Sequence, residues 1–342
     1  MSFSKYATSF REKAISAGFS ADNIQKCLVY AEPLYRKNLP IIYNTTNLSA
    51  LVGYNKTYLK KAALYTEYFY RKFDIKKKNG KLRKIKEPLP SLKEIQLWIL
   101  QNILYEVPVS RFAKAYVKKR NIKENVKFHV DQDKVLSLDI RDFFPSIKRR
   151  SVEDIFLSLG YSSNISNLLG KLCCLDEALP QGAPTSPYLS NIFMSGIDAK
   201  IAKFCTDKKI KYTRYADDMI FSGDFDEEIL IPVVKHEIET AGLKINEEKT
   251  RVMRRNVPQI VTGVVVNQKT QLPRKDRDRL RLEMHFIIKF GLSSHLQQIK
   301  NTKANYLKHI EGKIQYALFI NPEDKELIDY LAYIKEHLTP DN

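Results

Sequence analysis

The spacing of apolar side chains predicts a mostly helical chain with a few short strands. Through residues 1–70, apolar positions recur three or four residues apart, as at Tyr6 and Phe10, which is the helical period. The same period returns in five later stretches: 91–103, 152–159, 165–172, 226–241 and 272–290. Short apolar runs typical of strands lie at 134–139, 212–221, 243–246 and 260–267.

Two adjacent acids interrupt the apolar run at 212–221. Asp217 and Asp218 are preceded by a segment with two tyrosines and followed by an apolar segment, which predicts two strands joined by a tight turn. Because Asp is a favoured turn residue, an ordinary polar turn stays open as an alternative. A third acid, Asp139, ends the apolar run at 134–139. Three carboxylates converging from strand ends would be able to bind two divalent ions.

A cationic hairpin is predicted earlier in the chain. Residues 68–75 and 81–85 alternate in strand fashion on either side of Asn79-Gly80, a dipeptide that strongly favours a hairpin turn. Lysines and arginines fill this segment, so it is either a solvated hairpin or a surface that receives a triphosphate. In the second interpretation Arg83 binds by its planar fork and Lys81 as a point charge.

Two further segments suit a nucleotide site. Asp139 is followed closely by Phe143-Phe144-Pro145, which would set a flat apolar wall beside a carboxylate, large enough for a sugar. Residues 179–192 form a Pro/Gly-rich loop that enters a helix, and backbone N–H groups point outward where a helix begins. By contrast, a single histidine beside a strand, such as His129, is usually a structural residue.

Charge points to a polyanionic partner. The 342 residues include 57 Lys and Arg against 39 Asp and Glu, a formal net charge of +18. Nucleic acid is the partner that this excess favours, with a generally basic protein or an anionic membrane surface as alternatives. The basic helical pattern at 272–290 is open to the same two interpretations, a solvated face or a face toward nucleic acid.

The four cysteines lack the paired spacing of a zinc site or a disulfide framework. The first residues do not resemble a secretory signal, and no apolar run approaches the ~20 residues of a membrane span. We therefore expect reduced thiols in a cytoplasmic protein that does not bind membranes.

Three acids, a cationic hairpin and a sugar-sized wall together favour phosphoryl transfer with two Mg²⁺ ions. The chain resembles the reverse transcriptases in Tyr215-Ala216-Asp217-Asp218, in the Asp139 segment ending at Ile147, and in the loop Pro180-Gln181-Gly182 with Ser186-Pro187. Within them it resembles the bacterial retron enzymes through Val261-Thr262-Gly263 and Asn125-Val126-Lys127-Phe128-His129. That family's pattern for the second segment is Asn-Ala-x-x-His, so Val126 is a departure.

The resemblance implies an α+β fold of the right-hand polymerase type, with fingers, palm and thumb. We expect a helical N-terminal region at 1–70, fingers at 71–130, a palm at 131–268 with finger helices inserted at about 150–178, and a helical thumb at 269–342.

The resemblance also implies roles for individual residues. Asp139, Asp217 and Asp218 would be catalytic and hold two Mg²⁺ ions, with the Ile140 carbonyl as a further ligand. The nucleotide would contact Lys81, Arg83, Phe144, Gln181 and Lys249, with Phe144 disfavouring ribonucleotides and Lys249 protonating pyrophosphate. RNA would contact the basic helix and the residues beyond it: Arg274, Lys275, Arg277, Arg279, Arg281 and Lys313.

The implied activity is that of an RNA-directed DNA polymerase. It would use dNTPs to copy part of a structured noncoding RNA into DNA, priming from an RNA 2′-hydroxyl to give branched msDNA, in anti-phage defence with a separate effector protein. A catalytically inactive RNA-binding protein of the same fold stays open, as do a group II intron-like and a diversity-generating reverse transcriptase.

Overall fold

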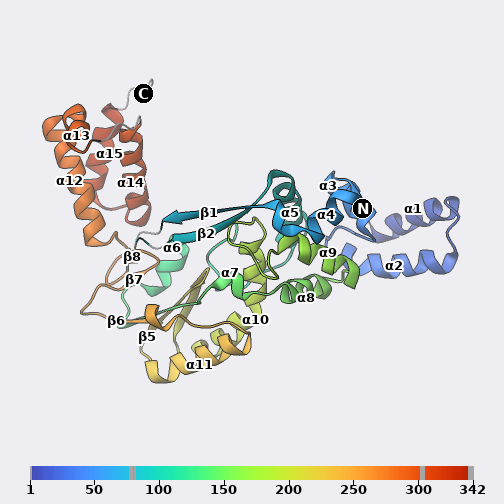
Figure 1. Ribbon diagram of the computed structural model, residues 1–342. Coiled ribbons are helices and arrows are strands. Elements are labelled where there is room, and N and C mark those ends of the chain that lie inside the picture. Colours follow the sequence, from blue (N-terminus) through green and yellow to red (C-terminus); the bar gives the residue numbers. More distant parts are fainter. Residues whose placement is uncertain (1, 77–79, 81, 301–304, 338–342) are drawn as a thin grey trace. The chain divides into compact units, whose positions relative to one another are not determined.

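The computed structural model describes residues 2–76, 80, 82–300 and 305–337. Figure 1 labels most of its helices and strands. They form two compact units, each of which is discontinuous in sequence. The first unit comprises Met1–Lys118, Ile140–Lys203 and Pro232–Asn246, and the second comprises Lys119–Asp139, Phe204–Ile231 and Glu247–Asn342.

The first unit begins with four helices, as the periodicity predicts. They are α1 (Phe3–Ser16), α2 (Ala21–Arg36), α3 (Thr45–Val52) and α4 (Lys56–Leu64). Each follows a Ser or Asn whose side chain accepts a hydrogen bond from the backbone N–H three residues on. Such caps satisfy an otherwise unpaired donor of the first helical turn.

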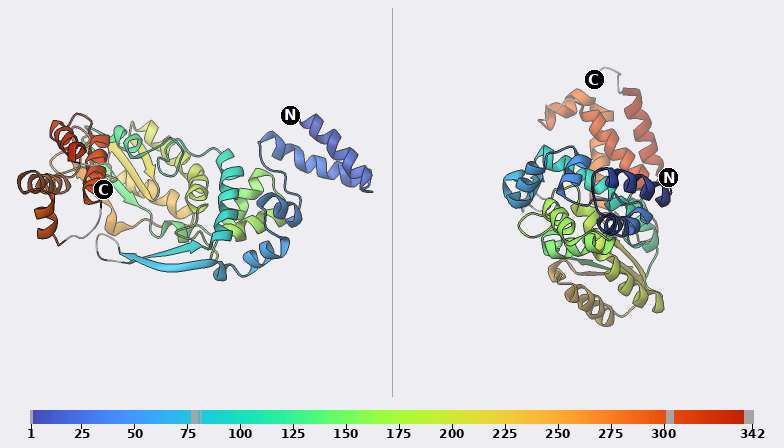
Figure 2. Two further views of the ribbon diagram at one scale, coloured as in Figure 1. Left: turned by 90° about the horizontal axis from the view of Figure 1, so that it is seen from above. Right: turned by 90° about the vertical axis from the view of Figure 1, so that its right-hand side faces the viewer.

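The predicted hairpin is present in the first unit. After a short 3₁₀ turn, η1 (Thr66–Phe69), strands β1 (Tyr70–Lys76) and β2 (Leu82–Pro88) pair antiparallel, with Tyr70 opposite Pro88 and Lys76 opposite Leu82. Figure 2 shows the two strands (light blue) running side by side. Asn79, at the predicted turn, lies outside the described residues.

Helices make up most of the rest of this unit. They are α5 (Pro90–Asn102), η2 (Leu104–Glu106), α7 (Phe143–Ser146), α8 (Arg149–Leu159) and α9 (Ser163–Cys173). Two longer helices, α10 (Ser186–Asp207) and α11 (Glu227–Thr240), have residues in both units.

A four-stranded antiparallel sheet organises the second unit. Its strands are β3 (Lys134–Asp139), β4 (Lys211–Tyr215), β5 (Asp218–Gly223) and β6 (Arg251–Arg254), in the order β4-β5-β3-β6. The short elements α6 (Ile122–Val126) and η3 (Lys127–His129) precede β3, and η4 (Glu247–Lys249) precedes β6. Strands β7 (Ile260–Val261) and β8 (Val264–Val265) form a separate small hairpin.

The described residues from 274 to 337 form four helices. They are α12 (Arg274–Phe290), α13 (Leu292–Gln298), α14 (Tyr306–Ile320) and α15 (Lys325–His337). Their apolar faces share one core, which includes Leu280, Met284, Ile310 and Leu327. A second core lies between the sheet and the β7–β8 hairpin and includes Val135, Ile220, Val261 and Val264.

The sequence therefore anticipated the mixed helix and strand content. The strand predicted at 243–246 is wrong, because the structure has only one bridging pair there, Ile245 with Ile140. The boundaries set for fingers, palm and thumb stay a prediction. Within the described part of the chain, no helix is both long and apolar enough to cross a membrane.

Candidate active site

The predicted tight turn joins β4 to β5. Tyr215 lies opposite Asp218, so Ala216 and Asp217 are the two turn residues. Ala216 has a φ of +59° at the first turn position, where glycine is the usual residue when φ is positive. The Arg214 side chain is fully buried, and its Nη1 donates to the Ala216 carbonyl (3.0 Å). A buried guanidinium thus supports a strained turn that carries a carboxylate.

Asp139 lies directly across the sheet from Asp218. The two residues are the last registered pair between β3 and β5, and directly opposite side chains on neighbouring strands are close enough to interact. The Lys249 ammonium, carried on η4, donates to both oxygens of the Asp139 carboxylate at 2.7 and 2.8 Å. The three acids and Lys249 are therefore parts of one electrostatic system.

The crowding of these acids changes their pKa values. Burial, followed by the charges of Asp217 and Asp139, raises the pKa of Asp218 from 3.8 to about 7, and Lys249 partly offsets this. Burial lowers the pKa of Lys249, but the hydrogen bond to Asp139 and the charges of the three acids outweigh it and leave that pKa raised. Negative charge is thus concentrated here beyond what one lysine neutralises.

The donor set suits a divalent cation. Hard cations such as Mg²⁺ prefer carboxylate oxygens, and the raised pKa of Asp218 marks a position where a nearby positive charge would be stabilising. Among the described residues, no three acids, histidines or cysteines are already arranged as a ligand set. Asp139 instead points its carboxylate at Lys249.

The pKa of Asp218 predicts how stability changes with pH in protein treated with EDTA. Between pH 4 and 7 the folded chain holds a proton on Asp218 that the unfolded chain releases, so the free energy of unfolding falls as pH rises through this range. At about 1.4 kcal/mol per pKa unit, a shift from 3.8 to about 7 corresponds to about 4 kcal/mol. Urea unfolding of wild type and Asp218→Asn across this range measures it, and equal slopes for the two proteins would contradict the prediction.

The predicted nucleotide-contacting residues that the structure describes lie in the first unit, apart from Lys249. The Gln181 carbonyl accepts from the Lys86 backbone N–H on β2 (2.8 Å), and Arg83 lies three residues before Lys86 on that strand. Gly182 has a φ of +127°, and a Cβ there would come within 2.8 Å of the Lys86 carbonyl. Glycine therefore allows the Gln181 loop to lie against β2.

The remaining predicted nucleotide contacts are placed as follows. Phe144 is half-buried on α7, with its ring centroid 5.4 Å from that of Phe143 and 6.3 Å from that of Tyr116. Ile140 is buried. Arg83 is exposed opposite Ile75, on the face of the hairpin away from Lys84 and Lys86. Lys81 lies outside the described residues.

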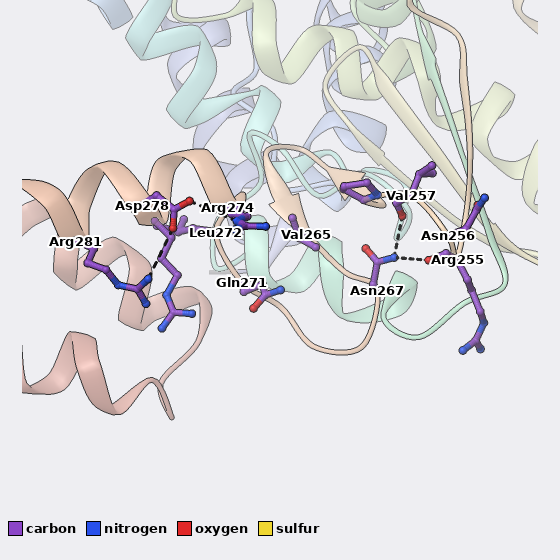
Figure 3. A pocket seen from close by; sticks show the side chains of 12 residues that line it. Arg255, Asn256, Val257, Val265, Asn267, Gln271, Leu272, Arg274, Asp278 and Arg281 are labelled. Carbon is purple, nitrogen blue, oxygen red and sulfur yellow. Dashed lines mark hydrogen bonds and ion pairs between the residues drawn. The ribbon is translucent and has the colours of Figure 1, made fainter.

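The predicted RNA-binding cations divide into two groups. Arg277 and Arg281 form ion pairs with Glu326, and Lys313 pairs with Glu283, so these three hold α12 against α15 and α14. Arg274, Lys275 and Arg279 are exposed and have no ion pair to another helix among the described residues, although Arg274 pairs with Asp278 on α12 itself. A hollow with a volume of about 580 Å³ lies beside α12. Figure 3 shows some of the residues that line it, among them Arg255, Asn267, Arg274 and Arg281.

Sequence reasoning missed the residues that support the turn. Arg214, Thr213 and Ser222 are all buried, although their polar side chains suggest exposure. The available signal was Arg214, which lies between Tyr212 and Tyr215 in the predicted strand, because a charged residue within a buried strand needs a specific partner. The structural interpretation of His129 is confirmed, since its ring is fully buried and hydrogen-bonded at both nitrogens.

Comparison with known proteins identifies the family. Residues 75–311 match the family described as reverse transcriptase (RNA-dependent DNA polymerase). The retron Ec86 reverse transcriptase of Escherichia coli is 30% identical over 308 residues, which cover 87% of this chain and 91% of that protein. The chain belongs to the retron reverse transcriptases. The retron Mx65 reverse transcriptase of Myxococcus xanthus is also 30% identical, over 89% of this reverse transcriptase and 74% of its relative.

Solved structures resemble this reverse transcriptase more distantly. A telomerase from Candida albicans in complex with a TWJ fragment of telomeric RNA has a TM-score of 0.43 and 12% identity, over 77% of this chain and 61% of that one. A foamy viral protease-reverse transcriptase in complex with double-stranded DNA has a TM-score of 0.44 and 15% identity, over 82% of this chain and 43% of that one. This chain spans less than two thirds of either structure.

Family membership confirms the predicted enzyme class and fold class. The retron reverse transcriptase is an RNA-directed DNA polymerase with the α+β right-hand fold of its family. Its substrates are RNA and DNA, and its family uses divalent metal ions. The intron-like and diversity-generating alternatives are not favoured, because the relatives matched over most of the chain are retron enzymes.

Proposed function

We propose that this reverse transcriptase copies part of a structured noncoding RNA into DNA, beginning at a 2′-hydroxyl of that RNA. The product would be a branched RNA–DNA molecule, msDNA. Membership of the retron reverse transcriptases supports this proposal, and a net charge of +18 suits an enzyme that stays bound to a folded RNA. We propose further that it acts in anti-phage defence together with a separate effector protein.

In the proposed mechanism, Asp139, Asp217 and Asp218 hold two Mg²⁺ ions. The observation that carries this assignment is the placement of Asp139 opposite Asp218 at the β4–β5 turn, with the pKa of Asp218 raised by burial and by the other two acids. Bound there, the two ions would lower the pKa of the attacking hydroxyl and neutralise the leaving pyrophosphate. The Ile140 carbonyl is proposed as a further ligand.

The chain's other residues bind and orient the nucleotide in this proposal. Arg83 and Lys81 hold the triphosphate, and Gln181 lines the pocket. Phe144 lies beneath the sugar. Lys249 already carries a proton next to Asp139, with a raised pKa, and it donates that proton to pyrophosphate as the bond to the α-phosphate breaks.

Sequencing of the nucleic acid that copurifies with the full chain tests the proposed product. We expect one RNA species with DNA joined at an internal 2′-position, which a debranching enzyme converts into separate RNA and DNA strands. Bulk cellular RNA without attached DNA would contradict the proposal. The matched control is the Asp217→Asn/Asp218→Asn protein, which should copurify with the same RNA lacking DNA.

The exposed cations of α12 are proposed to contact RNA phosphates. Lys275 and Arg279 are exposed and have no ion-pair partner within the described part of the chain. Replacing both with alanine should weaken RNA binding and reduce the slope of log K against log salt by about 1–2. Filter binding at several salt concentrations measures this slope.

The control for α12 keeps the change in net charge the same. Lys325 and Lys335 are exposed on α15, and their replacement by alanine should leave the salt slope nearly unchanged. Arg277 and Arg281 are unsuitable targets, because their loss would also break the ion pairs to Glu326. Equal slopes for wild type and the Lys275/Arg279 variant would mean that these cations face solvent and do not contact RNA.

A further inference from the structure

Two segments that mark the chain as a retron enzyme have no part in the proposed chemistry. They are Asn125–His129, spanning α6 and η3, and Val261–Gly263, at the turn between β7 and β8. We propose that they form a clamp that holds the catalytic turn in position, with His129 as its central positioning residue. This inference rests on the proposed role of Asp217 and Asp218.

His129 is hydrogen-bonded to both strands that flank the proposed catalytic turn. Its Nδ1 is hydrogen-bonded to Ser222 Oγ on β5 and its Nε2 to Thr213 Oγ1 on β4, both at 2.7 Å. A neutral imidazole has one donor and one acceptor, and a hydroxyl can serve as either, so both bonds form together. All three side chains are buried, and a buried polar group that loses its partner is costly.

The turn itself requires such support. Ala216 holds a positive φ of +59°, and a strained backbone persists only where the surrounding structure enforces it. Arg214 supports the turn from within by donating to the Ala216 carbonyl. His129 fixes both strands below the turn, at Thr213 two residues before β4 ends and at Ser222 four residues after β5 begins.

The second segment extends the clamp to the β7–β8 hairpin. Val261 pairs with Val264, so Thr262 and Gly263 are the turn residues, and both have positive φ, +47° and +84°. Such a φ is uncommon for a β-branched residue. The Thr262 hydroxyl accepts a hydrogen bond from Asn125 Nδ2 (3.3 Å), which gives threonine a function that its turn propensity does not explain.

Side-chain packing also links the β7–β8 hairpin to the sheet, and it accounts for valine at position 126, where the family pattern has alanine. Val126 is fully buried in the same core as Val261 and Ile220, so its side chain fills space between the small hairpin and the sheet. The Asn125 and His129 side chains are likewise fully buried. Direct RNA reading needs exposed groups, and this burial favours positioning over recognition for both side chains.

A pair of substitutions at Thr213 tests the clamp in the full-length protein. Thr213→Val removes the hydroxyl with little change in shape, whereas Thr213→Ser retains it. We expect Thr213→Val to lower kcat about 10- to 100-fold on a poly(rA)/oligo(dT) template, because second-layer contacts to metal-binding residues have effects of this size. Mn²⁺ binding without nucleic acid, followed by electron paramagnetic resonance, should weaken in the same variant. The KM for dTTP and the Kd for RNA should change less than about twofold, and Thr213→Ser should behave like wild type.

The Gln96→Leu variant is the control for effects that come only from a general loss of stability. Gln96 is a buried residue of the first unit that donates to Tyr70 Oη and to the Leu172 carbonyl, both at 2.8 Å. If Thr213→Val lowers Tm and kcat no more than Gln96→Leu and leaves Mn²⁺ binding intact, the clamp inference is overturned. The same conclusion follows if Thr213→Val weakens RNA binding while kcat and Mn²⁺ binding stay unchanged.

The Asp217→Asn/Asp218→Asn variant serves as a reference that separates a failure of the proposed catalytic site from a failure of the clamp inference. If this reference still synthesises DNA and binds Mn²⁺ as wild type does, the proposed catalytic site itself is wrong, and the clamp inference is lost with it. If the reference loses both properties and Thr213→Val loses neither, only the clamp inference is wrong.

Discussion

Replacing Asp217 and Asp218 with asparagine is expected to abolish DNA synthesis while RNA binding is retained. Asparagine keeps the size of the side chain and one oxygen, but it removes the negative charge that holds a divalent cation. Metal ions stabilise the transition state by several kcal/mol, and each 1.4 kcal/mol is a factor of ten in rate. Extension of a labelled primer on an RNA template should therefore fall at least about 1,000-fold.

The control for this experiment removes two other acids from the same unit. Asp224 is exposed after β5 and Glu228 is exposed in the first turn of α11, so Asp224→Asn/Glu228→Gln produces the same change in net charge. It should retain near wild-type synthesis. Wild-type synthesis by the Asp217/Asp218 variant would remove these residues from the catalytic role.

The sequence revealed those elements whose cause is local. The period of apolar residues and the capping residues Ser2, Ser20, Asn44 and Asn55 mark the N-terminal helices. The β4–β5 and β1–β2 hairpins were also visible, because each has turn residues between alternating strands. In contrast, β6 was missed, since Arg251–Arg254 is short, lies at the sheet edge and buries only Met253.

The predicted catalytic acids were visible, but their environment was not. Three acids at strand ends suggested a shared site, and the register places Asp139 opposite Asp218. The contact between Lys249 and Asp139 joins residues 110 positions apart, and no local pattern signals such a contact. The burial of Arg214 depends in the same way on tertiary packing.

The cations of α12 show how a charge pattern can mislead. A run of basic residues at 274–281 predicts a single cationic face, yet Arg277 and Arg281 point to Glu326 on α15. Glu326 has a pKa lowered to about 2, chiefly by its hydrogen bond from Arg281. These ion pairs join elements about 45 residues apart, so sequence alone could not distinguish the cations that pair with another helix from those that do not.

Removing the Phe144 side chain is expected to weaken discrimination against ribonucleotides. In the proposed site the ring lies beneath the sugar and leaves no room for a 2′-hydroxyl, so Phe144→Ala opens that space. Steric selection of this kind contributes about 10- to 200-fold. The ratio of kcat/KM for dTTP to that for UTP, measured by single-nucleotide extension, should fall by a factor in this range.

Phe144→Tyr separates the loss of bulk from a change in packing. Tyrosine keeps the ring against Phe143 and Tyr116, so we expect its sugar discrimination to remain close to that of wild type. The Phe144→Ala variant should keep most of its rate with dTTP, because the ring is only half-buried and its loss leaves the catalytic acids unchanged. If Phe144→Ala instead slows dTTP and UTP equally, the ring serves to pack α7 against Tyr116, and selection against the 2′-hydroxyl must come from another residue.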